Sequence, residues 1–180
     1  MMNPGLRKFA LTLHITCSVG WIGAVMAFLA LVIAALTSQD IQILRAVWIA
    51  LDLLGFLVII PLAIVSLLSG LVMSLGTKWG LFQHYWVLFS FALTVFAILV
   101  LLGNMQSVKY LAGIVNDMDI SNVDILRAGL QSELLHAGIG LIVLVIIQVL
   151  NVYKPRGLTS YGWRKQQEQR AVRQTVTPET

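Results

Sequence analysis

Four long apolar stretches constrain this chain more than any other feature of its sequence. They run from about Phe9 to Leu36, Ala46 to Leu75, Leu81 to Gln106 and Leu130 to Tyr153. Crossing the apolar core of a bilayer takes about 20 residues of α-helix. In lipid, every backbone N–H and C=O needs a partner within its own segment, so each stretch is expected to be a helix. The sequence therefore predicts an all-α, four-helix transmembrane domain over residues 1–156.

The composition excludes the other broad classes of protein. The chain is 58% apolar and 11% charged, whereas soluble domains are about 45–50% apolar and about 25% charged. Disordered chains are poor in apolar residues and rich in charge. The single cysteine, Cys17, excludes an intramolecular disulfide. The first apolar stretch is longer than the apolar region of a cleavable signal peptide, which spans about 7–15 residues, so it is expected to be a true span.

The distribution of basic residues predicts the orientation in the membrane. Nine lysines and arginines fall on one side of the spans: Arg7, Lys8, Lys78, Lys154, Arg156, Arg164, Lys165, Arg170 and Arg173. Three fall on the other side: Arg45, Lys109 and Arg127. Cytoplasmic loops are enriched in basic residues, so both termini are expected in the cytoplasm, with the helices running up, down, up and down. Because the basic residues lie at membrane edges, lipid headgroups rather than nucleic acid are the expected partner.

Two polar segments flank the fourth span. The run Asn116–Asp119 before it is expected to be a solvated loop on the outer side. After it, Lys154 and Pro155 end the helix, because Pro cannot extend it and Lys favours the headgroup region. Residues 157–180 then form a basic cytoplasmic tail. Trp163 beside Arg164 indicates that its first half rests on the inner headgroups, and its last ten residues are expected to be disordered.

Small residues indicate where the helices pack, since helices in lipid associate by close approach. In the first span, one stripe of small residues lies opposite His14 and is free to contact a second subunit. It consists of Gly20, Gly23, Ala27, Ala30 and Ala34. We therefore hypothesise a homodimer through this stripe. Each later span carries one stripe of polar and small residues that is expected to face the interior; in the second span these are Asp52, Gly55, Ala63, Ser66, Gly70 and Ser74.

Ionisable side chains within the spans are costly and are therefore candidates for function. They are His14, Asp52, His84, Glu133 and His136. A rise of about 1.5 Å per residue sorts them into two layers. His14 and His84 lie in an inner layer, within about 5 Å of one another in depth. Asp52, Glu133 and His136 form an outer polar layer, with Asn104 near it.

The inner layer suggests a haem b site, because a neutral imidazole in an apolar bundle is a natural axial ligand for haem iron. His14 is the first candidate ligand and His84 the second, with Trp21 and Cys17 lining the slot. The protein is then expected to be cytochrome b-like and to act in electron transfer or redox chemistry, with a quinone or a redox protein as its partner. A membrane oxidoreductase is one form of this hypothesis, although the sequence indicates no catalytic residue.

Two other interpretations stay open. Histidines that only bridge helices would suit a cofactor-free assembly or interaction factor, and the aromatic residues around His84 are typical of an interfacial belt. The outer polar layer would suit a transporter of a metal, such as copper, or of a small solute.

The segment Leu11–Gly23 resembles the first helix of a group of bacterial tetraspan inner-membrane proteins. The group includes the membrane domain of copper-resistance protein D, the tetraspan protoporphyrinogen oxidase and small uncharacterised integral membrane relatives. His14, Trp21 and Gly23 match its first-helix pattern, and Leu135–Pro155 is similar to the last helix of the uncharacterised relatives. The resemblance implies a multi-pass protein of the bacterial inner membrane, nearest to those relatives. From the oxidase branch, it also implies haem at His14.

The same resemblance argues against porphyrinogen oxidation. The oxidase branch has a Leu-Pro-Arg element after the first-helix Trp and a lysine in the third helix. Here the corresponding stretches, Ala24–Ala30 and Trp86–Ser90, contain neither.

Overall fold

The computed structural model describes residues 3–76, 80–115 and 123–176. The helices are α1 (Pro4–Thr37), α2 (Ile41–Leu54), the π-helical turn η1 (Gly55–Ile59), α3 (Ile60–Gly76), α4 (Tyr85–Ile114), α5 (Val123–Tyr153) and α6 (Ser160–Val176). Lys78 and the run Asn116–Asp119, for which we made predictions from the sequence, lie outside the described residues. α2, η1 and α3 join into one continuous span, so the described chain has four helices long and apolar enough to cross a membrane.

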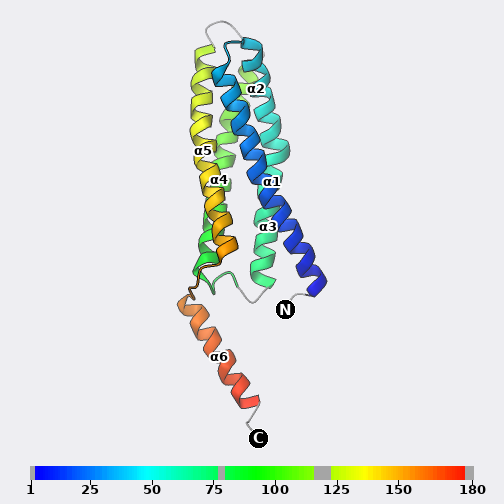
Figure 1. Cartoon of the computed structure of the whole chain (residues 1–180), viewed down its shortest axis with the longest axis vertical. Helices are drawn as coiled ribbons and strands as arrows, with labels where there is room; N and C mark the ends of the chain where they lie inside the picture. The colour runs from blue at the N-terminus through cyan, green and yellow to red at the C-terminus, as the bar shows by residue number, and fades with distance from the viewer. Residues whose placement is uncertain (1–2, 77–79, 116–122, 177–180) are drawn as a thin grey trace.

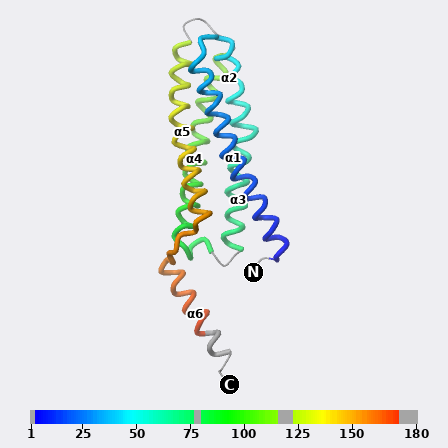
Figure 2. The backbone as a smooth tube through the Cα atoms, in the orientation of Figure 1, coloured from blue at the N-terminus to red at the C-terminus, as the bar shows by residue number. Residues whose placement is uncertain are grey.

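The four spans form an antiparallel bundle, in which each span packs beside the next along the chain (Figure 1). α1 packs against α2 and α3 on one side and against α5 on the other, and α4 completes the ring. The start of α1 and the end of α5 lie at the same end of the bundle, as the backbone trace in Figure 2 also shows. The predicted all-α four-helix architecture is therefore confirmed. The side of the membrane on which the termini lie stays a prediction.

Local hydrogen bonds explain where the first two helices begin. The side chain of Asn3 accepts a hydrogen bond from the N–H of Gly5 (3.0 Å), and Pro4 occupies the first helical position, where a missing N–H costs nothing. Asp40 caps α2 in the same way, since its carboxylate accepts from the N–H of Gln42 (2.8 Å). Arg127 of α5 donates to the carbonyl of Ser38 (2.9 Å), which ties the α1–α2 turn to the fourth span.

The second span contains a widened helical turn that its hydropathy did not reveal. A proline within a helix removes one N–H and clashes with the carbonyl four residues earlier, which for Pro61 is that of Leu57. The π-helical turn η1 ends at Ile59, two residues before this proline, and includes Leu57. At its start, Gly55 lets α4 approach closely, because a Cβ there would overlap the sulfur of Met105.

The third span begins later than its apolar stretch suggested, at Tyr85 rather than Leu81. The residues before it pair instead with the linker between α5 and α6. Leu158 forms an isolated antiparallel bridge with His84, and the N–H of Thr159 donates to the carbonyl of Gln83 (3.0 Å). These backbone groups are satisfied by the linker rather than by a helix.

The end of the fourth span agrees with the sequence, because α5 stops at Tyr153. Lys154 adopts a left-handed conformation (φ 45°) directly before Pro155, so the helix cannot continue. α6 then projects away from the bundle (Figure 1) and extends to Val176, further than we expected for the tail. Trp163 is 55% exposed on it. The contact of the tail with headgroups and the disorder of its end stay predictions.

The stripe of the second span faces the inside of the bundle as expected, whereas the stripe of the first span lies outside except for Gly20, for which the prediction was wrong. In the second span, Gly55, Ala63, Ser66 and Ser74 are buried. In the first span, a Cβ at Gly20 would contact Leu62 of α3 at 3.4 Å, so this glycine belongs to the α1–α3 interface. The other four stripe residues of this span are all exposed on the outer surface: Gly23, Ala27, Ala30 and Ala34. The homodimer itself stays a prediction.

Candidate functional site

His14 lies in a polar seam between α1 and α3. Its Nδ1 is 3.0 Å from the carbonyl oxygen of Ser66 and 3.1 Å from the Oγ of Ser69. A carbonyl oxygen only accepts, so Nδ1 carries the proton and donates it to Ser66. Gly70 makes room for the ring, because a Cβ there would lie 3.0 Å from Cε1 of His14. The sequence pattern identified Ser66 and Gly70 as interior positions but missed Ser69.

The other residues expected around a haem at His14 have different neighbours. His84 occupies the position before the first residue of α4, where its backbone pairs with Leu158 and its ring lies 6.5 Å from that of Trp86. Cys17 is buried as a free thiol. Trp21, which is 4% exposed, lines a cavity formed with α4 and α5. His14 thus bonds to α3, whereas the backbone of His84 pairs with the linker after α5. Trp21 lines a cavity that contains neither histidine.

The outer polar layer contains a hydrogen bond between α4 and α5. Asn104 of α4 donates from Nδ2 to Oε2 of Glu133 on α5 (2.6 Å), and Glu133 is only 2% exposed. His136 follows one helical turn later on α5. Asp52 of α2 is a separate case, since its buried Oδ1 has no hydrogen-bond partner within the described part of the chain.

Two cavities flank Asn104 and His136, which line both of them. The first, of about 310 Å³, is almost entirely apolar. It is lined by Trp21, Val25, Phe28, Ile59, Phe96, Ala97, Val100, Leu101, Asn104, Met105, His136, Ala137, Ile139, Gly140, Val143 and Leu144. The second, of about 410 Å³, is more polar and is lined by Val100, Gly103, Asn104, Ser107, Leu111, Gly129, Ser132, Glu133 and His136.

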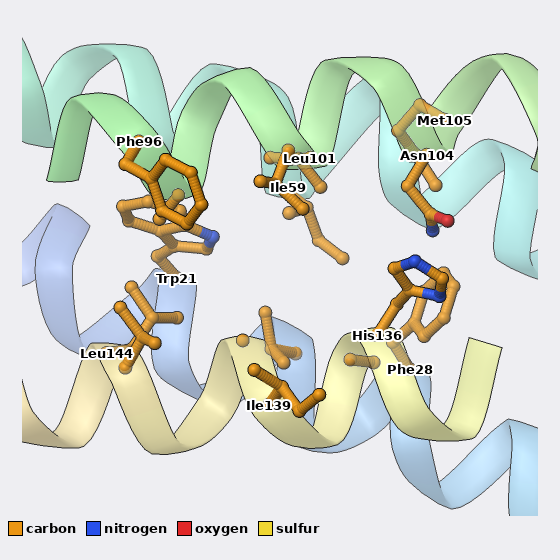
Figure 3. A pocket seen from close by; sticks show the side chains of 16 residues that line it. Trp21, Phe28, Ile59, Phe96, Leu101, Asn104, Met105, His136, Ile139 and Leu144 are labelled. Carbon is orange, nitrogen blue, oxygen red and sulfur yellow. The ribbon is translucent and has the colours of Figure 1, made fainter. Parts of the chain in front are cut away.

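We call the first cavity the α4–α5 crevice. In Figure 3, His136 and Asn104 point toward one another at one end of it, and Trp21 and Phe96 lie at the other end. Phe96 and Ile139 line it although each is 62% exposed on the outer surface of the bundle. The crevice therefore reaches the surface that faces lipid. It combines apolar walls with a polar pair at one end.

The small residues that leave space for the crevice carried a weak signal in the sequence. Ala97 belongs to the stripe of polar and small residues in the third span and Gly140 to that of the fourth span, and both line the crevice. A Cβ on Gly140 would meet nothing within 4 Å, so the glycine faces open space rather than a neighbouring helix. A stripe of small residues predicts that a neighbouring helix packs there. Whether the helix makes contact or leaves a cavity depends on the side chains that it places opposite the stripe.

Among the described residues, no three His, Cys, Asp or Glu side chains are grouped closely enough to hold a metal ion. Comparison with protein-family models, with curated proteins and with solved structures finds no match to this chain. The resemblance of Leu11–Gly23 to bacterial tetraspan proteins therefore stays an expectation.

Proposed function

We propose that this membrane protein binds a lipid-soluble redox molecule of the quinone class in the α4–α5 crevice and serves redox chemistry in the bacterial inner membrane. One observation carries the proposal: an apolar cavity open toward lipid ends in the polar pair Asn104 and His136. Small-molecule sites are typically apolar, with a few polar groups that orient the ligand.

The size and walls of the crevice suit a ring. Its volume of about 310 Å³ is at the lower end of the range of about 300–1,000 Å³ that is usual for ligand sites. A ring-sized head would fill it, and an isoprenoid tail would leave between Phe96 and Ile139 into the bilayer. Trp21 and Phe28 offer aromatic surfaces on which a flat ring packs favourably.

The polar end suits the oxygen of such a head group. The imidazole of His136 and the amide of Asn104 lie within one end of the crevice (Figure 3). The buried carboxylate of Glu133 holds the amide nitrogen of Asn104, which fixes the orientation of the amide. A preorganised pair of this kind loses little conformational entropy when a ligand binds.

The experiment uses the protein in lipid nanodiscs, titrated with a short-tailed quinone. Binding is followed by quenching of tryptophan fluorescence, because Trp21 forms a wall of the crevice. We expect saturable quenching that is lost in Trp21→Phe. We also expect Gly140→Leu to weaken binding at least tenfold, because the new side chain enters the open space beside Gly140.

Gly138→Leu is the matched control. It lies on the same helix, a Cβ added there would also meet nothing within 4 Å, and it does not line the crevice. We expect it to bind as the wild type does. Equal quenching in Gly140→Leu and Gly138→Leu would mean that quinone acts from the bilayer and that the crevice is not its site.

Haem b is a second candidate, because the Nδ1 of His14 donates to a backbone carbonyl. This bond orients an imidazole so that Nε2 remains for a metal. However, the ring packs against Gly70, and neither of the two cavities described above is lined by His14 or His84. The closed α1–α3 seam does not fit a porphyrin, so we derive no step through haem.

The haem hypothesis has a direct test in the absorption spectrum of protein purified from haem-competent cells. Haem held by His14 predicts a Soret band that is lost in His14→Ala and kept in His136→Ala. His84→Ala should convert a low-spin spectrum into a high-spin one if His84 is the second ligand. A colourless wild type, together with failure of quinone to bind, would favour the cofactor-free assembly factor, in which His14 only bridges α1 and α3.

A further inference from the structure

The proton on His136 can be located from its hydrogen bonds. Its Nδ1 is 2.9 Å from the carbonyl oxygen of Ser132, one turn earlier on α5, and 3.3 Å from the Oγ of the same residue. Because a carbonyl oxygen only accepts, Nδ1 carries the hydrogen and donates it to Ser132. In the neutral ring, Nε2 then has a lone pair and no hydrogen.

Nε2 is the nitrogen of His136 that is left for a ligand. The ring lines the crevice and points toward Asn104 (Figure 3), while Nδ1 is engaged with its own helix. The polar end of the crevice therefore presents an acceptor at His136.

Asn104 offers the complementary group. Its Nδ2 donates one hydrogen to Oε2 of Glu133, and a side-chain amide nitrogen has two hydrogens to donate. The second hydrogen remains for a ligand oxygen. The end of the crevice thus combines one acceptor, at His136, with one donor, at Asn104, on opposite helices.

We propose that the crevice selects the reduced, hydroxyl-bearing form of its ligand, a quinol, over the oxidised quinone. The phenolic hydroxyl donates to Nε2 of His136, and its oxygen accepts from Nδ2 of Asn104. A quinone carbonyl has no hydrogen, so it would set a lone pair against the lone pair of Nε2. His136 is exposed on the outer surface of the bundle, where lipid offers no hydrogen-bond partner. A polar atom left without a partner in an apolar environment is costly, and sites built to pair a hydroxyl reject analogues that lack it.

This inference rests on the proposed function, and its test compares three ligands of the same ring and tail: the hydroquinone, the quinone and the hydroquinone dimethyl ether. Affinity for the protein in nanodiscs is measured by competition against a fixed short-tailed probe. We expect the hydroquinone to bind at least about tenfold more tightly than either other ligand. The ether controls for ring shape, because it keeps the oxygens and loses both hydroxyl hydrogens.

The variant His136→Phe should abolish the preference for the hydroquinone, because Phe keeps a ring in the crevice and removes the acceptor. His84→Phe is the matched control, since it makes the same substitution directly before the first residue of α4, at a residue that does not line the crevice, and should keep the preference. The comparison in the wild-type protein tests the inference even if His136→Phe does not fold.

The outcomes separate this inference from the proposed function. Quinone binding as tight as hydroquinone binding, or a preference retained in His136→Phe, overturns the inference and leaves the crevice as a quinone-class site. Absence of binding by all three ligands overturns the proposed function and the inference with it.

Discussion

The amide of Asn104 donates a 2.6 Å hydrogen bond to the carboxylate of Glu133, and this bond joins α4 to α5 beside the crevice. Glu133 is almost completely buried although most of α5 faces outward. A carboxylate is expensive to place within a bundle in lipid unless it is paired. The pair therefore holds two helices together and orients the amide that we assign to ligand binding.

A double-mutant cycle should measure this bond. We expect Asn104→Ala and Glu133→Ala each to destabilise the protein. Their coupling energy should be about 0.6 kcal/mol, the average for hydrogen bonds between membrane helices, and at most about 1.7 kcal/mol. Unfolding in mixed micelles gives the free energies. Gln131→Ala, at an exposed position of α5, is the control and should change the free energy of unfolding little. Additive effects of the two substitutions would show that the bond contributes nothing.

The close contact of Gly55 with Met105 should fix how closely α4 packs against η1. We expect Gly55→Ala to cost about 1–3 kcal/mol, as overpacking of a close contact does, because a Cβ would overlap the sulfur of Met105. The double variant Gly55→Ala with Met105→Ala should recover part of that cost relative to the sum of the single changes. If the two costs simply add, α4 relaxes away from η1 and the contact is not a constraint.

The packing of the start of α6 against Gln83 should require a glycine at position 162. A Cβ at this residue would overlap the backbone carbonyl of Gln83, which cannot move as a side chain can. We expect Gly162→Ala to detach the linker and to speed hydrogen exchange at the N–H of Thr159, which donates to the same carbonyl. Gly157→Ala is the control, since its Cβ would meet Tyr85 at an ordinary 3.7 Å. Unchanged exchange in Gly162→Ala would contradict the close approach.

The outer part of the first-span stripe should decide the oligomeric state. A Cβ added at Gly23 would meet nothing within 4 Å, and Ala27 is exposed one turn further along α1. If two copies meet there, replacing both residues by Leu should convert a dimer into a monomer in detergent, because bulky side chains prevent the close approach that holds helices together in lipid. Mass measured by light scattering checks this. A monomeric wild type, or a variant that remains dimeric, rules out this interface.

The orientation predicted from the basic residues can be checked with reporters. Fusions after Arg156 and within the segment Asp117–Asp124 should report opposite sides of the membrane, with the first in the cytoplasm. The described bundle requires opposite sides, because α5 separates the two points. A periplasmic signal after Arg156 would invert the orientation and leave the bundle intact.

The number and approximate bounds of the spans followed from the sequence, because the bilayer itself sets the length of an apolar helix and forces its backbone bonds to be internal. The end of α5 at Tyr153 followed for an equally local reason, since Pro155 cannot continue a helix. The delayed start of α4 at Tyr85 did not, because the residues before it pair with a linker more than 70 positions away in the chain. Hydropathy contains no information about such a partner.

The apolar stretches thus indicate a membrane-spanning helical chain, and the sequence shows which few polar residues its spans contain. Which of these residues meet depends on the packing of the helices. His14 bonds to Ser66 and lines neither of the two cavities, and Trp21 shares the α4–α5 crevice with His136. Helices that are apolar on all sides gain little from turning one face inward, since lipid is as apolar as the bundle interior. Their rotations are set instead by close packing, such as that of Gly55 on Met105, and this depends on side chains from different helices at once.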